Sequence, residues 1–144
     1  MRSIAQMLSL MLLLTASPVV ASSSAIEGTW LSGDGDGLIG IKVTDTLLRG
    51  VILGSTADDP GRPQTDVKNP DPALRDRLLI GLDLFSGFTY DGNGAWSGGF
   101  IYDPNSGKTY RCKLQLVDHN TLKVRGFIGI ALLGRTEIWK RQDD

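Results

Sequence analysis

The alternation of apolar and polar residues with a period of two is the feature that most constrains the fold of this 144-residue chain. It is clearest over residues 110–116, where apolar positions alternate with arginine, lysine and glutamine. Successive side chains of a β-strand point to opposite faces, so this pattern predicts a strand with one buried and one solvated face. The same alternation recurs at residues 39–43 and 122–128, and a β-rich fold is therefore expected.

Turn signals divide the chain into short strands. The Asp-Gly and Asn-Gly pairs within residues 34–37 and 91–94 favour the positive φ angles of tight hairpin turns. Residues 103–107 and 118–120 supply two further turns. The strands expected between these signals cover residues 28–31, 39–43, 47–53, 79–90, 96–102, 110–116, 122–128 and 133–141. The sequence therefore predicts an all-β fold, an eight-stranded antiparallel up-and-down barrel, because closure removes the exposed edges of the sheet.

A long, proline-rich and charged loop interrupts this pattern at residues 66–82. Pro70 and Pro72 each fix one φ angle and make the backbone stiff. Asp71 is placed to cap a short helical turn over residues 73–76. Two interpretations remain open: a lid or recognition edge beside the barrel, or a connection whose charges pair in solvent.

The N-terminal segment has the features of a secretory signal. An apolar run over residues 8–16 follows a positive residue and precedes a small-residue cleavage pattern at residues 19–21. We expect residues 1–21 to be a signal peptide and residues 22–144 a single β-barrel domain, with cleavage after Ala25 as the alternative. The apolar run is too short to span a membrane, so the mature protein is expected in the periplasm or outside the cell, with no membrane span.

The charge distribution gives no support for a nucleic-acid partner, and the single cysteine rules out an internal disulfide. The formal net charge is −1, and the basic residues are scattered, so no nucleic-acid partner is expected. Cys112 is the one cysteine of the chain and cannot form an internal disulfide. Its place among alternating apolar positions predicts a small buried hydrophobic residue.

No catalytic or metal-binding pattern stands out. The one histidine, His119, lies in an expected turn, so no nucleophile–histidine pair can be assigned and an enzyme is the less favoured class. An EF-hand loop counted from Asp34 would need a glutamate at its twelfth position, where Asp45 stands instead. We therefore predict no catalytic residue, metal site or cofactor.

The last expected strand carries the polar residues that are candidates for the barrel interior. Arg135, Glu137 and Trp139 share one of its faces. An inward Trp139 is favoured because Thr136 and Lys140 occupy the other face. Arg135 and Glu137 would then lie in or near a cavity, paired with each other or with a polar ligand head group. If Trp139 faces outward, these charges belong to the surface.

Two sets of residues are therefore candidates for binding a small amphipathic ligand. The first would hold the ligand tail against apolar side chains, with the head near Arg135; it comprises Phe100, Tyr110, Leu114 and Val124. The second would form a polar barrel mouth from Asp71, Arg75 and Arg77, because the arginine fork binds carboxylate or phosphate. Asp71 is placed to hold Arg75 or Arg77 while the site is empty. If the two arginines instead pin the loop to the barrel, their role is structural.

Three segments of the chain together resemble a known family. They read DVKNPDPALRDRLLIGL, WSGGFIYDPNSGKTYRCKLQL and LKVRGFIGIALLGRTEIWKR, and they resemble the DUF2147 family of small exported bacterial proteins of unknown function. Arg77 departs from the family pattern, because Leu78 rather than proline follows it. The resemblance implies an envelope protein with a barrel like those of lipocalins or fatty-acid-binding proteins, without an established activity.

Gly28-Thr29-Trp30 is similar to the G-x-W opening of lipocalins, whose tryptophan plugs the closed end of the barrel under a basic residue. In an eight-stranded meander the start of the first strand neighbours the end of the last one. Arg141 or Lys140 is therefore expected to cover Trp30. A cation over an indole face contributes about 0.5–1 kcal/mol when exposed.

Two classes of function follow from these residues. The first is a module that binds a small amphipathic or hydrophobic molecule in the cell envelope. The alternative is an envelope protein with a solid barrel core that docks an unidentified partner through residues 66–77. Eight-stranded barrels lie near the limit between filled and ligand-holding interiors, so the interior volume distinguishes the two classes.

Overall fold

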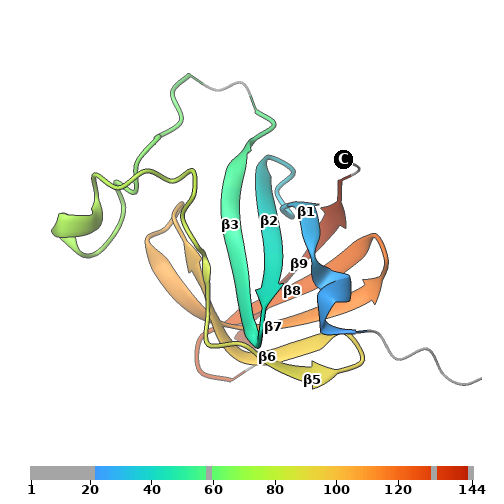
Figure 1. Ribbon diagram of the computed structural model, residues 1–144. Helices are drawn as coiled ribbons and strands as arrows, with labels where there is room; N and C mark the ends of the chain where they lie inside the picture. The colour runs from blue at the N-terminus through green and yellow to red at the C-terminus, as the bar shows by residue number, and fades with distance from the viewer. Residues whose placement is uncertain (1–21, 58–59, 131–132, 143–144) are drawn as a thin grey trace, which may run out of the picture.

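The computed structural model describes residues 22–57, 60–130 and 133–142, which form a strongly curled antiparallel sheet (Figure 1). These residues include two short 3-10 turns, η1 (Ser23–Ile26) and η2 (Pro72–Leu74). The signal peptide predicted at residues 1–21 lies outside the described residues. The described part of the chain contains no helix of the length and apolar character needed to cross a membrane.

The sheet has the order β3-β2-β1-β9-β8-β7-β6-β4, and β5 also pairs with β6. Every pairing between strands is antiparallel, and chain neighbours are mostly sheet neighbours, as expected for an up-and-down barrel. The strands are β1 (Gly28–Leu31), β2 (Gly37–Thr44), β3 (Leu47–Ser55), β4 (Phe85–Ser86), β5 (Thr89–Gly92), β6 (Ala95–Asp103), β7 (Lys108–Asp118), β8 (Thr121–Phe127) and β9 (Arg135–Arg141). The predicted all-β, eight-strand barrel is confirmed, with one of its eight strands broken into β4 and β5.

The broken strand closes the barrel. β4 and β5 pair with successive parts of β6, and Gly87 between them has a φ of +72°. Upstream of β4 the chain bonds to β3, where Leu84 N donates to Gly50 O at 2.7 Å and Ile52 N donates to Leu82 O at 3.0 Å. The strand predicted over residues 79–90 is therefore shorter than expected and is interrupted at Gly87.

One end of the barrel is plugged by Trp30, which is fully buried. The guanidinium carbon of Arg141 lies 4.3 Å from the ring centroid of Trp30, which confirms the expected cation cover. The indole N–H of Trp30 donates to Ile26 O at 2.9 Å, so η1 lies against the same end. Gly28 has a φ of +138°, and a Cβ there would lie 2.5 Å from Arg141 Nη1. The positive φ and the close approach of Arg141 both favour glycine at the first position of G-x-W.

Candidate functional site

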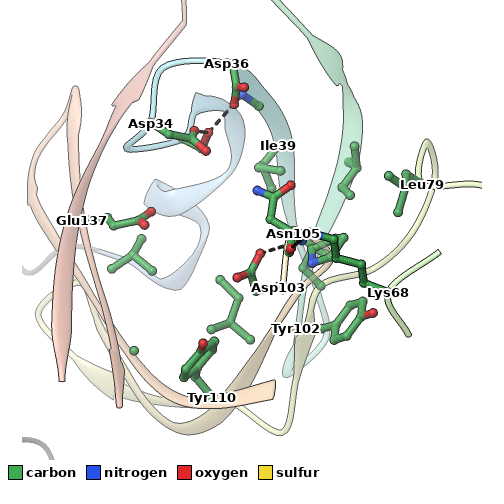
Figure 2. Close-up of a pocket in the computed structure, with 18 of the residues that line it drawn as sticks. Asp34, Asp36, Ile39, Lys68, Leu79, Tyr102, Asp103, Asn105, Tyr110 and Glu137 are labelled. Atoms are coloured by element: carbon green, nitrogen blue, oxygen red, sulfur yellow. Dashed lines mark hydrogen bonds between the residues drawn. The ribbon is translucent and has the colours of Figure 1, made fainter. Parts of the chain in front are cut away.

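A cavity of about 800 Å³ occupies the barrel between the Trp30 plug and the opposite end (Figure 2). Its wall combines apolar side chains from several strands, namely Ile39, Ile52, Leu84, Ile101, Val124 and Trp139. Tyr110 contributes to the same wall (Figure 2). A solid barrel core, which the alternative prediction required, does not fit this volume.

Charged residues from chain connections and from the strands β6 and β9 line the cavity. Four carboxylates and three cations line the cavity, namely Asp34, Asp36, Asp103, Glu137, Arg62, Lys68 and Arg135. Two of the cations face carboxylates, because Arg62 pairs with Asp36 and Arg135 Nη2 lies 3.6 Å from Glu137 Oε1. Lys68 Nζ donates to Asn105 O at 2.8 Å. The interior of the cavity is therefore apolar, and the positive and negative charges at its mouth nearly cancel.

Asp34 carries a charge at the mouth. Its carboxylate accepts a hydrogen bond from the Ser32 hydroxyl. Burial alone would raise the pKa of Asp34. Hydrogen bonds with the Ser32 side chain and with the side chain and backbone of Asp36 outweigh burial, and the pKa is lowered. The carboxylate is therefore ionised at neutral pH.

Trp139 faces inward, as favoured by the sequence. It is buried, and its ring stacks on Phe85 with 6.2 Å between the ring centroids. The indole N–H of Trp139 donates to Glu137 Oε2 at 3.2 Å, which holds Glu137 along the cavity wall (Figure 2). Arg135 is 82 % exposed at its side chain and lies at the edge of the cavity. The structure thus brings Tyr110, Arg135, Glu137 and Trp139 together around one cavity.

Cys112 is buried on the inner side of β7, in agreement with the prediction from its alternation. Burial, with the charge of Glu137 as a smaller cause, raises the pKa of the Cys112 thiol to about 12. A thiol in this state is a poor nucleophile at neutral pH.

Phe100 does not line the cavity, which corrects the prediction for its side chain. The pairing of β6 with β7 shifts register between Trp96 and Gly99, where Gly98 has a φ of +71°. This bulge adds one residue to β6, so positions that follow it change faces. Gly99 then packs against the ring of Phe88, whereas Phe100 is 39 % exposed.

The charged loop also differs from the prediction, because Asp71, Arg75 and Arg77 are absent from the cavity wall. Figure 1 shows η2 standing out from the strands at the far left. Asp71 caps η2 by accepting from Ala73 N at 3.0 Å, as expected. Arg75 Nε donates to Asn69 O at 2.8 Å, and Arg77 pairs with Asp66 instead of Asp71. The expected mouth of arginines held by Asp71 is therefore replaced by contacts within the loop.

Asp66 is the centre of a buried polar group that fixes the loop to β6; we call Asp66, Asn69, Arg77 and Tyr102 the anchor cluster. The Asp66 carboxylate accepts from Tyr102 Oη at 2.6 Å, from Asn69 Nδ2 at 2.8 Å and from Arg77 Nε at 2.9 Å. The guanidinium of Arg77 also lies 5.6 Å from the centroid of the Tyr102 ring. This supports the interpretation in which an arginine pins the loop to the barrel.

The anchor cluster affects the cavity because its neighbours line it. Thr65, Val67 and Lys68, which flank Asp66, contribute to the cavity wall, and so does Tyr102. Gly107 reinforces the docking of the loop, since a Cβ there would lie 1.9 Å from Lys68 O. The loop is thus one wall of the mouth, held in place by Asp66.

Sequence reasoning missed the mouth residues of the connections, among them Asp34, Asp36, Lys68 and Asp103. The hairpin aspartates lie in turns, as the sequence predicts, but alternation within a strand does not indicate which turns share one end of the barrel. In an up-and-down barrel alternate connections lie at the same end. That rule places residues 32–36 and 104–107 at the end opposite Trp30.

The described residues include no group of three or more histidine, cysteine or acidic side chains that could hold a metal ion. The cavity combines apolar contact inside with hydrogen-bonding and charged groups at the mouth, a combination that is typical of small-molecule pockets.

A barrel plugged at one end by a tryptophan under an arginine, and open at the other to an internal cavity, is a lipocalin-like barrel. The chain belongs to the DUF2147 family, described as uncharacterized protein conserved in bacteria, whose profile matches residues 28–141.

The fold is similar to that of protein HP1028 from the human pathogen Helicobacter pylori, which is described as belonging to the lipocalin family. The two chains are 20 % identical with a TM-score of 0.70, over 82 % of this chain and 83 % of the other. A comparison with curated protein sequences found no match.

Proposed function

We propose that this protein is an exported barrel that binds one small amphipathic or hydrophobic molecule in the cell envelope. The observation that carries the proposal is the cavity of about 800 Å³, apolar inside and polar at its mouth. Pockets for small molecules typically enclose about 300–1,000 Å³ and combine apolar walls with a few polar groups. The plugged end gives the cavity a floor, so one end of a ligand is directed to the mouth.

The tail of the ligand would lie against Tyr110, Val124 and Trp139, and its head would lie near Arg135 and Glu137. Glu137 already accepts from Trp139 and faces Arg135. A polar head therefore joins an existing network instead of meeting an isolated charge, which lowers the cost of its desolvation.

Filling the cavity from β8 should abolish ligand retention. Gly126 lines the cavity, and a Cβ there would lie 3.5 Å from Tyr110 Cβ, an ordinary contact distance. A Gly126→Leu substitution therefore directs its side chain into free space. We expect native mass spectrometry of protein purified from its own host to show a bound small molecule on the wild type and none on the variant.

Lys123→Leu is the matched control, because Lys123 is an exposed residue of the same strand. It should retain the ligand. The unfolding free energy of Gly126→Leu should stay within about 1 kcal/mol of the wild type, since replacing glycine in a strand is itself favourable. A wild-type barrel recovered empty from its host, or equal retention by Gly126→Leu, would contradict the proposal.

Export is a separate part of the proposal and is motivated by the apolar run and cleavage pattern of residues 1–21. We expect protein recovered from the extracytoplasmic fraction to begin at Ser22, as determined by N-terminal sequencing. Recovery there with Met1 intact would refute it.

A further inference from the structure

The mouth of the cavity carries exposed aliphatic side chains; we call Val67, Ile80, Ile128, Ile130 and Leu133 the apolar rim. Ile128 is 65 % exposed and Leu133 is 76 % exposed, and both line the cavity. Val67 and Ile80 are likewise exposed and line it from the long loop. Large aliphatic side chains in water around a cavity entrance indicate a surface that something else covers.

The apolar rim lies on two opposite sides of the mouth. Residues 128–134 connect β8 to β9, which lie in the middle of the strand order. Val67 and Ile80 belong to the loop from β3 to β4, the strands at the two ends of that order. In a closed barrel of this order the two connections face each other across the opening. Between them lie polar connections, with Asp34 and Asp36 on one side and Asp103 on the other. The mouth thus alternates apolar and polar sectors.

The connection between β8 and β9 has a composition that is unusual for an exposed loop. Its seven residues, IGIALLG at 128–134, include no polar or charged side chain. Exposed connections normally consist of polar residues, glycine and proline. Burial of the described side chains Ile128, Ile130 and Leu133 on a partner surface would remove this exposure.

We propose that the apolar rim docks the barrel mouth on the surface of a lipid bilayer. It extends the proposed function, because a bilayer is the phase in which an amphipathic ligand resides, and docking places the cavity entrance at that phase. The rim consists entirely of aliphatic residues, whereas protein interfaces are enriched in aromatic residues, methionine and arginine. The composition and the position around a cavity entrance therefore favour lipid over a protein partner.

The charges at the mouth predict how docking depends on lipid charge. Four carboxylates and three cations line the cavity, so they nearly cancel. Attraction to anionic lipid is then a minor contribution, and burial of the apolar rim is the major one. Binding should differ little between neutral and anionic vesicles and should persist at high salt.

The test is flotation of the chain that begins at Ser22 with phosphatidylcholine vesicles, with and without phosphatidylglycerol. Residues 1–21 are left out because their apolar run would bind lipid by itself. The protein should float with both vesicles, and Ile130→Ser combined with Leu133→Ser should weaken partitioning at least about tenfold, because two aliphatic side chains no longer enter the bilayer. Ile80→Ser tests the opposite side of the mouth and should weaken it in the same direction.

The matched control combines Leu47→Ser with Val117→Ser, two exposed aliphatic residues beside turns at the Trp30 end. This variant should float as the wild type does. The proposal is overturned if the wild type stays unbound, if the rim and control variants behave alike, if salt abolishes binding, or if the rim instead mediates dimers that form without lipid. Ligand retention by the wild type is measured in parallel by native mass spectrometry. A wild type that floats but is recovered from its host without a ligand refutes the proposed function alone, and a wild type that carries a ligand but does not float refutes lipid docking alone.

Discussion

Replacement of Trp30 by alanine is expected to lower the free energy of unfolding by about 3–5 kcal/mol, the usual cost of removing a core aromatic residue. Trp30 is fully buried and forms the floor of the barrel. Its removal would leave a cavity under Arg141, whose guanidinium donates to Ala25 O at 2.7 Å and to His119 O at 2.6 Å. The variant therefore weakens the hydrogen bonds from Arg141 to η1 and to the turn between β7 and β8 at the same time. Urea denaturation followed by circular dichroism measures the effect.

Trp30→Phe separates packing from hydrogen bonding in this prediction. Phenylalanine keeps an aromatic face for Arg141 but removes the indole N–H that donates to Ile26 O at 2.9 Å. A smaller loss is expected, about 1–3 kcal/mol, because the buried carbonyl is left without its donor. A loss below about 1 kcal/mol for Trp30→Ala would show that the plug is not part of the stable core.

The barrel could be predicted from the sequence because its determinants are local. Each strand is indicated by alternation over a few residues. The Asn93-Gly94 turn adopts the two positive φ angles that its sequence favours, 52° and 74°. The Trp30–Arg141 contact joins the first and last strands of the barrel, yet it was also predictable. In a meander the first and last strands are neighbours, so connectivity alone brings these residues together.

The error at Phe100 has a specific physical cause. Alternation assigns faces only while the register is unbroken, and the bulge at Gly98 moves every following residue by one position. Glycine within a strand often marks a bulge, and Gly98-Gly99 is the sequence signal for this one. A second alternation starting at Gly99 would have placed Ile101 inside and Phe100 outside, as observed.

The anchor cluster could not be predicted, because Asp66 and Tyr102 are 36 residues apart and Asp66 lies in a loop without a regular pattern. The sequence shows that the loop is stiff and charged, but it does not show which aspartate is buried. Asp71 is the obvious partner for the arginines because it is close in sequence. The fold instead buries Asp66, since Tyr102, Asn69 and Arg77 together satisfy its carboxylate.

The second large effect is expected for Asp66→Asn, at about 3 kcal/mol of unfolding free energy. Removing one partner of a buried ion pair costs about 3–5 kcal/mol, and the lower end applies because the Arg77 side chain is 35 % exposed and stays partly hydrated. The asparagine amide also points its NH2 group at one of the three side chains Tyr102, Asn69 and Arg77. Because each of these donates to Asp66 in the wild type, two donors then face each other and a hydrogen bond is lost. Urea denaturation of the wild type and of Asp66→Asn measures the difference in unfolding free energy. Arg77→Ala should also lower the unfolding free energy, because it removes the other partner of the same ion pair and leaves the cavity residues unchanged.

The pH dependence of stability gives this prediction a second measurement. Burial would raise the pKa of Asp66, but hydrogen bonds from Tyr102 and Asn69 and the ion pair with Arg77 lower it below its ordinary value of 3.8. The contribution of Asp66 is therefore fully present above that value and is lost as pH falls through the folded-state pKa. Burial, followed by the hydrogen bond to Asp66 and the charge of Asp66, raises the pKa of Tyr102 to about 12, so the phenol remains a donor at neutral pH. The difference in unfolding free energy between the wild type and Asp66→Asn should shrink in acid. The matched control is Asp71→Asn, which keeps the side-chain oxygen that accepts from Ala73 N and should cost little stability, because asparagine caps as well as aspartate does. Equal costs for the two substitutions at neutral pH would show that Asp66 does not hold the loop.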